Sequence, residues 1–249
     1  MSTIIDAHNH IGVRHGAAQT GAELLAKMDS VGVDRAVILP FVEGHIDNNV
    51  VEQEAQADPA RLIKFCAVNP WDGQAAIEEV RRCVEDLGFK GLKLHPTLHG
   101  YRLGDHGLMD PIFSAARDLG IIVTSHGASD LYNNPAEFGE MAARFPEVPL
   151  TMVHMGYFWE VELAIEMAGK NPNLYLDTSR APIFEIAQAV REIGAEKVIW
   201  GTDSPFVDYG IEFGKMARIE DPREYELVVG GNIARLLDAV PDRTPKNVS

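Results

Sequence analysis

Short aliphatic runs recur along this chain at a spacing of roughly thirty residues, and an amphipathic stretch follows most of them. Eight runs have strand character, at residues 4–10, 35–40, 62–70, 91–96, 121–127, 150–156, 174–179 and 198–203. Strands that alternate with helices are typical of βα units, and eight parallel strands close a barrel. The pattern predicts an α/β protein whose residues 1–249 form one domain, a (β/α)8 TIM barrel.

The intervening segments carry helix signals. Ile77, Val80, Val84 and Leu87 are three or four residues apart, so a helix would place them on one face that packs on the barrel. Helix starts are predicted where a capping side chain precedes a proline, at Asp110-Pro111, Asn134-Pro135 and Asp221-Pro222. Thr20 and Glu23 have the spacing of a capping box, which predicts a further start.

Composition narrows the function classes. The 249 residues are 46% hydrophobic and 24% charged, as in ordinary globular proteins, and the net charge of −15 disfavours nucleic acid and anionic membranes as partners. The N-terminal MSTIIDAHNH has no basic segment followed by an apolar one, and Cys66 and Cys83 form no CxxC pair. We therefore expect a cytoplasmic protein that acts on a small molecule, and leave open whether it pairs as a homodimer.

All nine histidines precede residue 155 and lie at or just after predicted strand ends. In a barrel, these ends share the face where enzymes place their active sites. Residues two apart on a strand point the same way, so His8 and His10 should face the barrel interior together. Imidazoles and a carboxylate bind divalent ions, which makes His8, His10, His126 and Asp203 candidate metal ligands. Any one of these histidines alone could instead be an ordinary buried side chain; the set in register favours a metal.

Six segments carry a resemblance to a known family: DAHNH at 6–10, GLKLHP at 91–96, SHG at 125–127, VHMG at 153–156, GTDSP at 201–205 and GGNIARLL at 230–237. Together they resemble the amidohydrolase superfamily, in particular the branch called amidohydrolase type 2. The resemblance implies that His8, His10, His126 and Asp203 hold one divalent ion, usually Zn²⁺. It also implies that His154 is catalytic, that Asp203 moves a proton as well as binding metal, and that Asp6 orients a ligand histidine.

The first functional expectation is a metal-dependent hydrolase that uses metal-activated water to cleave an ester, lactone or amide bond of a small molecule. The alternative is a nonoxidative decarboxylase of an aromatic or dienic acid on the same metal site. The intact HxH motif and the short chain are taken to favour hydrolysis. A third reading is a barrel that binds a ligand without catalysis, which the complete metal set argues against.

Substrate contacts are expected around the metal. Lys93 and His95 share a strand face, and we assign them to substrate binding, while a second metal bridged by a carboxylated Lys93 or a salt bridge to an interior carboxylate stays open. Tyr101 lies in a long loop after the fourth strand, and Arg14 follows the first. Basic groups gathered on one face of an acidic protein favour a carboxylate-bearing substrate.

Overall fold

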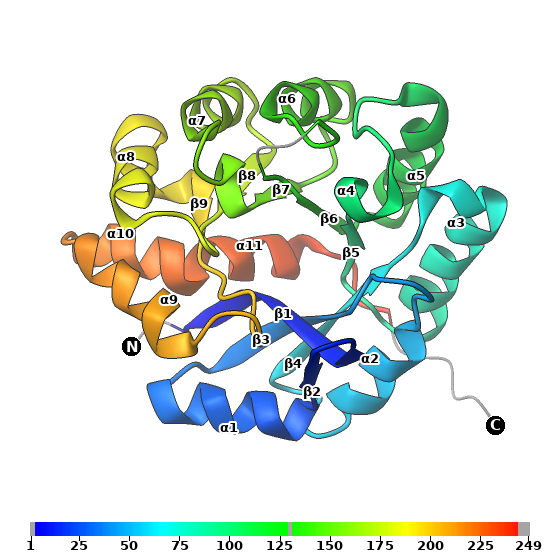
Figure 1. Ribbon diagram of the computed structural model, residues 1–249, viewed down its shortest axis with the longest axis horizontal. Coiled ribbons are helices and arrows are strands. Elements are labelled where there is room, and N and C mark those ends of the chain that lie inside the picture. Colours follow the sequence, from blue (N-terminus) through cyan, green and yellow to red (C-terminus); the bar gives the residue numbers. More distant parts are fainter. Residues whose placement is uncertain (1–2, 129–130, 244–249) are drawn as a thin grey trace.

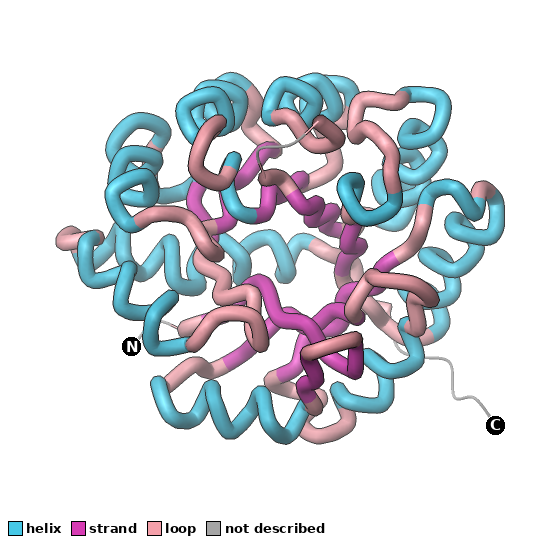
Figure 2. The backbone as a smooth tube through the Cα atoms, in the orientation of Figure 1, coloured by secondary structure: helices cyan, strands magenta, loops and turns pink. Residues whose placement is uncertain are grey.

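A curled sheet of nine strands organises the chain, for which a computed structural model describes residues 3–128 and 131–243. The strand order is β2-β1-β3-β4-β5-β6-β7-β8-β9, and every neighbouring pair is parallel except β1 with β2. The strands are β1 (Ile5–Arg14), β2 (Ala17–Gln19), β3 (Arg35–Pro40), β4 (Leu62–Ala67), β5 (Gly91–Leu94), β6 (Ile122–His126), β7 (Leu150–Val153), β8 (Leu174–Asp177) and β9 (Val198–Ile199). The sheet curls around a central axis, and most helices lie around its outside, while α11 crosses behind the opening in this view (Figures 1 and 2).

The helices follow the strands as the alternation predicts. They are α1 (Gly21–Val31), α2 (Asn48–Ala55), α3 (Gln74–Arg81), α4 (Pro96–His99), α5 (His106–Leu119), α6 (Pro135–Arg144), α7 (Val161–Lys170), α8 (Ile183–Ile193), α9 (Tyr209–Lys215), α10 (Pro222–Glu226) and α11 (Asn232–Ala239). Short helical turns add η1 (Pro70–Asp72), η2 (Arg82–Asp86), η3 (His154–Gly156), η4 (Ala195–Lys197), η5 (Met216–Arg218) and η6 (Leu227–Gly231). Within the described ranges, none of these helices is both long and apolar enough to cross a membrane.

The two ends of the parallel sheet approach each other through backbone hydrogen bonds. The amide of Ala7 donates to the carbonyl of Trp200 at 3.1 Å, and that of Asp203 donates to His8 at 2.9 Å. The amide of His10 donates to Ser204 at 2.7 Å. These bonds are made by Trp200, Asp203 and Ser204, which follow β9, and not by the residues of β9 itself. The mixed α/β class and the parallel sheet are confirmed. The predicted closure into an eight-stranded barrel is not, because the described residues form a curled nine-stranded sheet in which β9 and β1 share no ladder.

One strand, β2, is additional to the eight that were predicted. It pairs with the end of β1 in antiparallel fashion, with Val13 opposite Ala18. Gly16 in the connecting turn has φ of 80°, a left-handed conformation that glycine adopts without a steric penalty. A short hairpin therefore extends β1 beyond the point at which its apolar pattern ends.

Most of the predicted helix starts are correct. Thr20 and Glu23 form the capping box of α1, and Asn134 and Asp221 cap α6 and α10 with proline in the first turn. The start at Asp110-Pro111 is wrong, because α5 already begins at His106 and Pro111 lies inside it. Asp105 is the cap instead, and its side chain accepts the amide hydrogen of Leu108 at 3.3 Å. An earlier capping carboxylate therefore prevails over the Asp-Pro signal.

The apolar core lies between the sheet and its helices. The predicted stripe behaves as expected: Val80 and Val84 are buried, and Ile77 and Leu87 pack partly buried against the core. Each fully buried aliphatic or aromatic side chain contributes about 1.5–3 kcal/mol to stability. Polar groups buried at the carboxyl ends of the strands, by contrast, gain nothing from hydrophobic burial and need partners of their own.

Candidate metal and active site

Three of the predicted ligands lie together at the mouth of the curled sheet. Nε2 of His10 is 3.2 Å and Nε2 of His8 is 3.6 Å from Oδ1 of Asp203, and all three side chains are almost fully buried. Their ligand atoms lie within 4.8 Å of one another. The pleat of β1 places both histidines on one side, and the bond from the Asp203 amide to His8 brings the carboxylate to them. Two imidazole nitrogens and one carboxylate oxygen are donors that fit a divalent ion.

His126 and His154 lie next to this group. Their ring centroids are 5.0 Å apart, and the His154 ring is 5.5 Å from that of His8. His126 ends β6, whereas His154 follows β7 in a left-handed conformation with φ of 67°. The tight ligand groups within the described residues are His8-His10-Asp203 and His8-His154-Asp177, so His126 stands slightly outside both. Its ring stacks on His95 at 4.0 Å instead.

A cavity of about 500 Å³ opens over these side chains. Besides the five residues just described (His8, His10, His126, His154 and Asp203), its lining includes Arg14, Lys93, His95, Arg180 and Phe206. A larger cavity, of about 770 Å³, lies beside α2 and α3, away from the ligand groups. Because the smaller cavity contains the convergent donors, it is the candidate active site.

Tyr101 is placed elsewhere, so its predicted contact with substrate in this cavity must be corrected. It is buried, with 3% of its surface exposed, and lines a separate cavity together with Trp71 and Arg102. Helix α4 ends at His99 and is followed by Gly100 in a left-handed conformation, directly before Tyr101. Loop length in the sequence carries no information about that conformation.

Electrostatics favour neutral imidazoles around an anionic carboxylate. Burial lowers the pKa of His8 and of His126 well below the ordinary value, and lowers that of His154 to about 4. Burial alone would raise the pKa of Asp203, but the adjacent His8 and His10 hold it well below its usual range. Metal ligands must be deprotonated, and the candidate ligands His8, His126 and Asp203 are in that state at neutral pH.

Lys93 and His95 contact the ligand cluster from β5 and the residues after it. Nζ of Lys93 lies 3.2 Å from Nε2 of His8, and burial lowers the pKa of Lys93 to about 8 against the opposing effect of Asp203. Nδ1 of His95 accepts the amide hydrogen of Leu98 at 3.4 Å, so the neutral ring carries its proton on Nε2. His95 thus offers a hydrogen-bond donor to the cavity.

Asp6 acts on the backbone of a ligand, not on a ligand ring. Its Oδ1 accepts the amide hydrogens of His8 and Thr202, each at 3.0 Å, and its Oδ2 accepts the Thr202 hydroxyl at 2.6 Å. Asp6 therefore holds His8 through its backbone and links β1 to the segment that carries Asp203.

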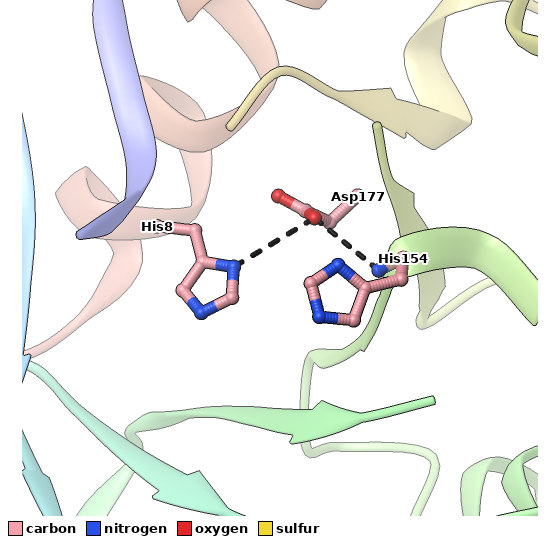
Figure 3. A group of neighbouring side chains, drawn as sticks. All are labelled: His8, His154 and Asp177. Carbon is pink, nitrogen blue, oxygen red and sulfur yellow. Dashed lines mark hydrogen bonds and ion pairs between the residues drawn. The ribbon is translucent and has the colours of Figure 1, made fainter. Parts of the chain in front are cut away.

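Three polar residues at or just after the end of β8 were not among the predicted site residues: Asp177, Ser179 and Arg180. Asp177 is fully buried, and its Oδ1 accepts the amide hydrogens of His154 at 3.3 Å and of Ser179 at 3.1 Å. Figure 3 shows it between the rings of His8 and His154, with His8 Nδ1 at 4.0 Å. Burial raises the pKa of Asp177 to about 7. The available signal was its position, since Asp177 lies near the end of the predicted strand at 174–179 and is the last residue of β8, as His126 is of β6.

Arg180, the last of these three residues, lies at the cavity wall. Its Nε donates to Oδ2 of Asp203, and its amide donates to Oε1 of Glu212 at 3.2 Å. Its guanidinium lies 5.4 Å from the centroid of Phe206, and that of Arg14 lies 5.0 Å from the same ring. Arg14 also pairs with Glu43. Two cationic side chains thus meet at the cavity wall.

Comparison with known proteins places the chain in a family. A sequence profile described as amidohydrolase matches residues 5–239, so the protein belongs to the amidohydrolase family. It is similar to 2-amino-3-carboxymuconate-6-semialdehyde decarboxylase of Dictyostelium discoideum, with 24% identity over 79% of this chain and 66% of the relative. It is also similar to gamma-resorcylate decarboxylase of Rhizobium sp. (strain MTP-10005), with 24% identity over 64% of each chain. The match spans just under two thirds of either relative's length.

Solved structures share the fold. A 2,6-dihydroxybenzoate decarboxylase in complex with 2,6-dihydroxybenzoate superposes with a TM-score of 0.79 at 17% identity, covering 96% of this chain and 99% of the other. The 5-carboxyvanillate decarboxylase of Sphingomonas paucimobilis gives a TM-score of 0.79 at 18% identity, with the same coverage. A dihydroxybenzoic acid decarboxylase of Polaromonas sp. JS666 with bound manganese gives 0.77 at 15% identity, covering 96% and 97%.

These comparisons overturn the first functional expectation. Both curated relatives are decarboxylases, and so are these three solved neighbours, so the reading as a hydrolase is wrong. The HxH motif concerns the binding of metal, and the chain length reflects the length of the loops. Neither feature indicates which bond is cleaved. The choice of zinc is likewise unsupported, because the neighbour described above holds manganese.

Proposed function

We propose that this protein is a metal-dependent nonoxidative decarboxylase of a small hydroxylated aromatic acid. The observation that carries the proposal is the convergence of His8, His10 and Asp203 in a buried cavity that Lys93 and Arg180 also line. The family and the decarboxylase relatives support the reaction type.

The architecture proposed to hold this site is a single-domain (β/α)8 barrel. Its eight strands are β1 and β3 to β9, and the backbone bonds that join Ala7, His8 and His10 of β1 to Trp200, Asp203 and Ser204 support closure of the ring. Closure matters for function because it brings His8 of β1 and Asp203, which follows β9, to one mouth.

The proposed metal ligands are His8, His10, His126 and Asp203. Three nitrogens and one carboxylate oxygen suit several divalent ions, and manganese is the first to test because solved neighbours contain it. When bound, the ion supplies positive charge that holds and polarises oxygen atoms of the substrate. Lys93 is proposed to stay uncarboxylated, as an ammonium group beside this site, because its Nζ already bonds to His8.

The cavity supports a carboxylate-bearing substrate with one ring. Its volume of about 500 Å³ lies in the range of small-molecule sites. Lys93, Arg14 and Arg180 provide positive charge on a chain whose net charge is −15, and His95 adds an N–H donor. An anionic substrate is drawn to this cationic wall although the rest of the surface repels it.

His154 is the proposed proton carrier. Decarboxylation breaks the bond between the ring carbon and the carboxylate carbon, releases CO₂ and adds a proton to the ring carbon. Neutral His154 accepts the proton of the substrate hydroxyl at Nε2 and returns it to that carbon; the phenolate left when CO₂ departs recovers a proton from water. Asp203 is held as a carboxylate, which suits metal binding and orientation of the substrate more than proton donation.

The test is CO₂ release. Protein stripped by a chelator and reloaded with Mn²⁺ or Zn²⁺ is incubated with 2,6-dihydroxybenzoate, other hydroxybenzoates and benzoate. We expect CO₂ from hydroxylated acids and none from benzoate, which has no hydroxyl proton to transfer. Fully loaded protein that releases no CO₂ from any hydroxylated acid would contradict the proposal.

Two variants separate metal binding from proton transfer. His8→Ala should lose both bound metal and CO₂ release. His154→Ala should keep the metal and lose about 10²- to 10⁴-fold in rate, as expected for a positioned acid or base. Metal analysis of both variants checks the assignment, and stoichiometric metal in His8→Ala would refute it.

A further inference from the structure

The hydroxyl of Ser179 lies among three site residues. Its Oγ is 2.9 Å from Nδ1 of His154 and 3.3 Å from Nδ1 of His8, and it donates to Oδ1 of Asp177. The ring nitrogens of His8 and His154 flank Asp177 in Figure 3. The group His8-His154-Asp177 has the spacing of a cation site, but the Ser179 hydroxyl already bonds to all three members. The arrangement is therefore a hydrogen-bond network.

The direction of these bonds follows from the number of protons. A hydroxyl has one hydrogen and two lone pairs. Oδ1 of Asp177 already accepts two backbone amide hydrogens, from His154 and Ser179, so it is an acceptor for the hydroxyl hydrogen too. With its only hydrogen directed to Asp177, Ser179 Oγ can only accept from the two imidazoles. Both Nδ1 atoms must then carry a proton.

Two further contacts agree with this assignment. Nδ1 of His154 lies 3.0 Å from the backbone carbonyl of Ser179, and a carbonyl only accepts, so this nitrogen must donate. Nε2 of His8 lies 3.2 Å from Nζ of Lys93, and an ammonium only donates, so that nitrogen must accept. His154 and His8 are thus each assigned Nδ1–H by a contact that does not involve the serine hydroxyl.

We infer that Ser179 is a positioning residue whose hydroxyl, held by Asp177, keeps His8 and His154 in the tautomer protonated at Nδ1. His8 Nε2 then carries a lone pair that accepts from Lys93 while no cation is bound, and this nitrogen lies 3.6 Å from Oδ1 of Asp203, where the cation is proposed. The lone pair of His154 Nε2 can accept a proton. One hydroxyl thereby prepares a metal ligand and the proton carrier together. The inference rests on the functions proposed for these two histidines.

The test reads the tautomers directly, without substrate. Metal-free protein with ¹⁵N-labelled histidine is examined by long-range ¹H–¹⁵N correlation, and the signals are assigned by their loss in His8→Ala and His154→Ala. We expect one Nδ1–H tautomer for each ring in the wild type. Nε2–H at either ring would overturn the inference, even if Ser179 variants failed to fold.

Variants of Ser179 then test whether its hydroxyl sets the tautomers of His8 and His154. Ser179→Ala should convert His8 to a mixture of tautomers, whereas His154 keeps part of its preference through the Ser179 carbonyl. Affinity for Mn²⁺, measured by competition with a chelator, should fall about 10- to 100-fold, as for other partners that orient a metal-bound histidine. Ser179→Thr, which restores a hydroxyl, should recover both, and Ser30→Ala on exposed α1 serves as control.

Two results separate this inference from the proposed reaction. Unchanged tautomers and unchanged Mn²⁺ affinity in Ser179→Ala would refute the positioning function even if CO₂ release is observed. Absence of CO₂ release from the wild type, with the tautomers as expected, would instead refute the reaction and leave the hydrogen-bond network standing.

Discussion

Arg180 and Asp203 are joined by a hydrogen bond from Nε of the arginine to Oδ2 of the carboxylate. The other carboxylate oxygen, Oδ1, faces Nε2 of His10 at 3.2 Å. The two oxygens of Asp203 therefore serve different partners, a cationic side chain at the cavity wall and the histidines of the ligand group. Because Oδ2 is bonded to Arg180, Oδ1 is the oxygen of Asp203 that can bind a cation.

Replacing Arg180 should affect substrate binding more than metal binding. Arg180→Met removes a charge-assisted hydrogen-bond donor, worth about 1.5–3 kcal/mol, from the cavity wall. We expect KM for a hydroxybenzoate to rise about 10- to 100-fold, because each 1.4 kcal/mol is about tenfold, while Mn²⁺ affinity changes less than about tenfold. Steady-state kinetics and chelator competition measure the two. Exposed Arg191→Met is the control, and an unchanged KM would argue against contact with substrate.

Lys93 should weaken metal binding in the wild type. Its Nζ is 3.2 Å from Nε2 of His8, so an ammonium there repels a divalent ion held by the same histidine. Lys93→Met should raise Mn²⁺ affinity about tenfold, equivalent to about 1.4 kcal/mol. Competition with a chelator measures the change, with exposed Lys170→Met as control. A loss of affinity would indicate instead that Lys93 helps to hold metal.

Gly201 should tolerate no side chain. A Cβ atom at this position would lie 2.2 Å from Oδ2 of Asp177 and 3.0 Å from Cβ of His8. Gly201→Ala should therefore lower the free energy of unfolding by about 1–3 kcal/mol, as overpacking does, and should disturb His8. Gly214→Ala in α9 is the matched control, because its Cβ would meet nothing within 4 Å. Urea titrations of both variants compare the two, and equal stability would contradict the packing argument.

Glu79 should contribute stability that depends on pH. Arg82 donates two hydrogen bonds to it, at 2.7 and 2.8 Å, and these hold the pKa of Glu79 below its ordinary value of 4.5 against the effect of partial burial. A carboxyl whose folded pKa is lowered binds its proton more readily when unfolded. Its stabilisation is therefore present above pH 4.5 and disappears as the pH falls through the folded value.

Glu79→Gln tests this contribution. The variant should be less stable than the wild type by up to about 1 kcal/mol at neutral pH, since the pair is partly exposed, and the difference should shrink in acid. Unfolding of chelator-treated protein in urea, at neutral pH and at a pH below the folded pKa, gives the two differences. Glu78→Gln, on the exposed side of α3, should show no comparable change. A difference that grows in acid would reverse the assigned sign.

Local features of the chain were predictable where neighbouring residues decide them. The capping box of Thr20 and Glu23 and the caps at Asn134 and Asp221 depend on contacts within about one helical turn, and the structure contains them. Pro111 shows the limit of such rules. Asp105 and Asp110 are both possible caps for one helix start, and the helix begins directly after Asp105, so that Pro111 lies inside it.

The sequence by itself determined the strand and helix alternation, the α/β class, the family, and the candidate ligands His8, His10 and Asp203, because these follow from periodicity and from short motifs at strand ends. Tertiary structure decided which residues meet. The hydroxyl of Ser179 bonds to His8 across 171 positions, and Tyr101 lines a different cavity although it follows His95 closely. Such contacts depend on how the sheet curls and where each loop turns, and these are set by packing over the whole fold, which no local pattern encodes.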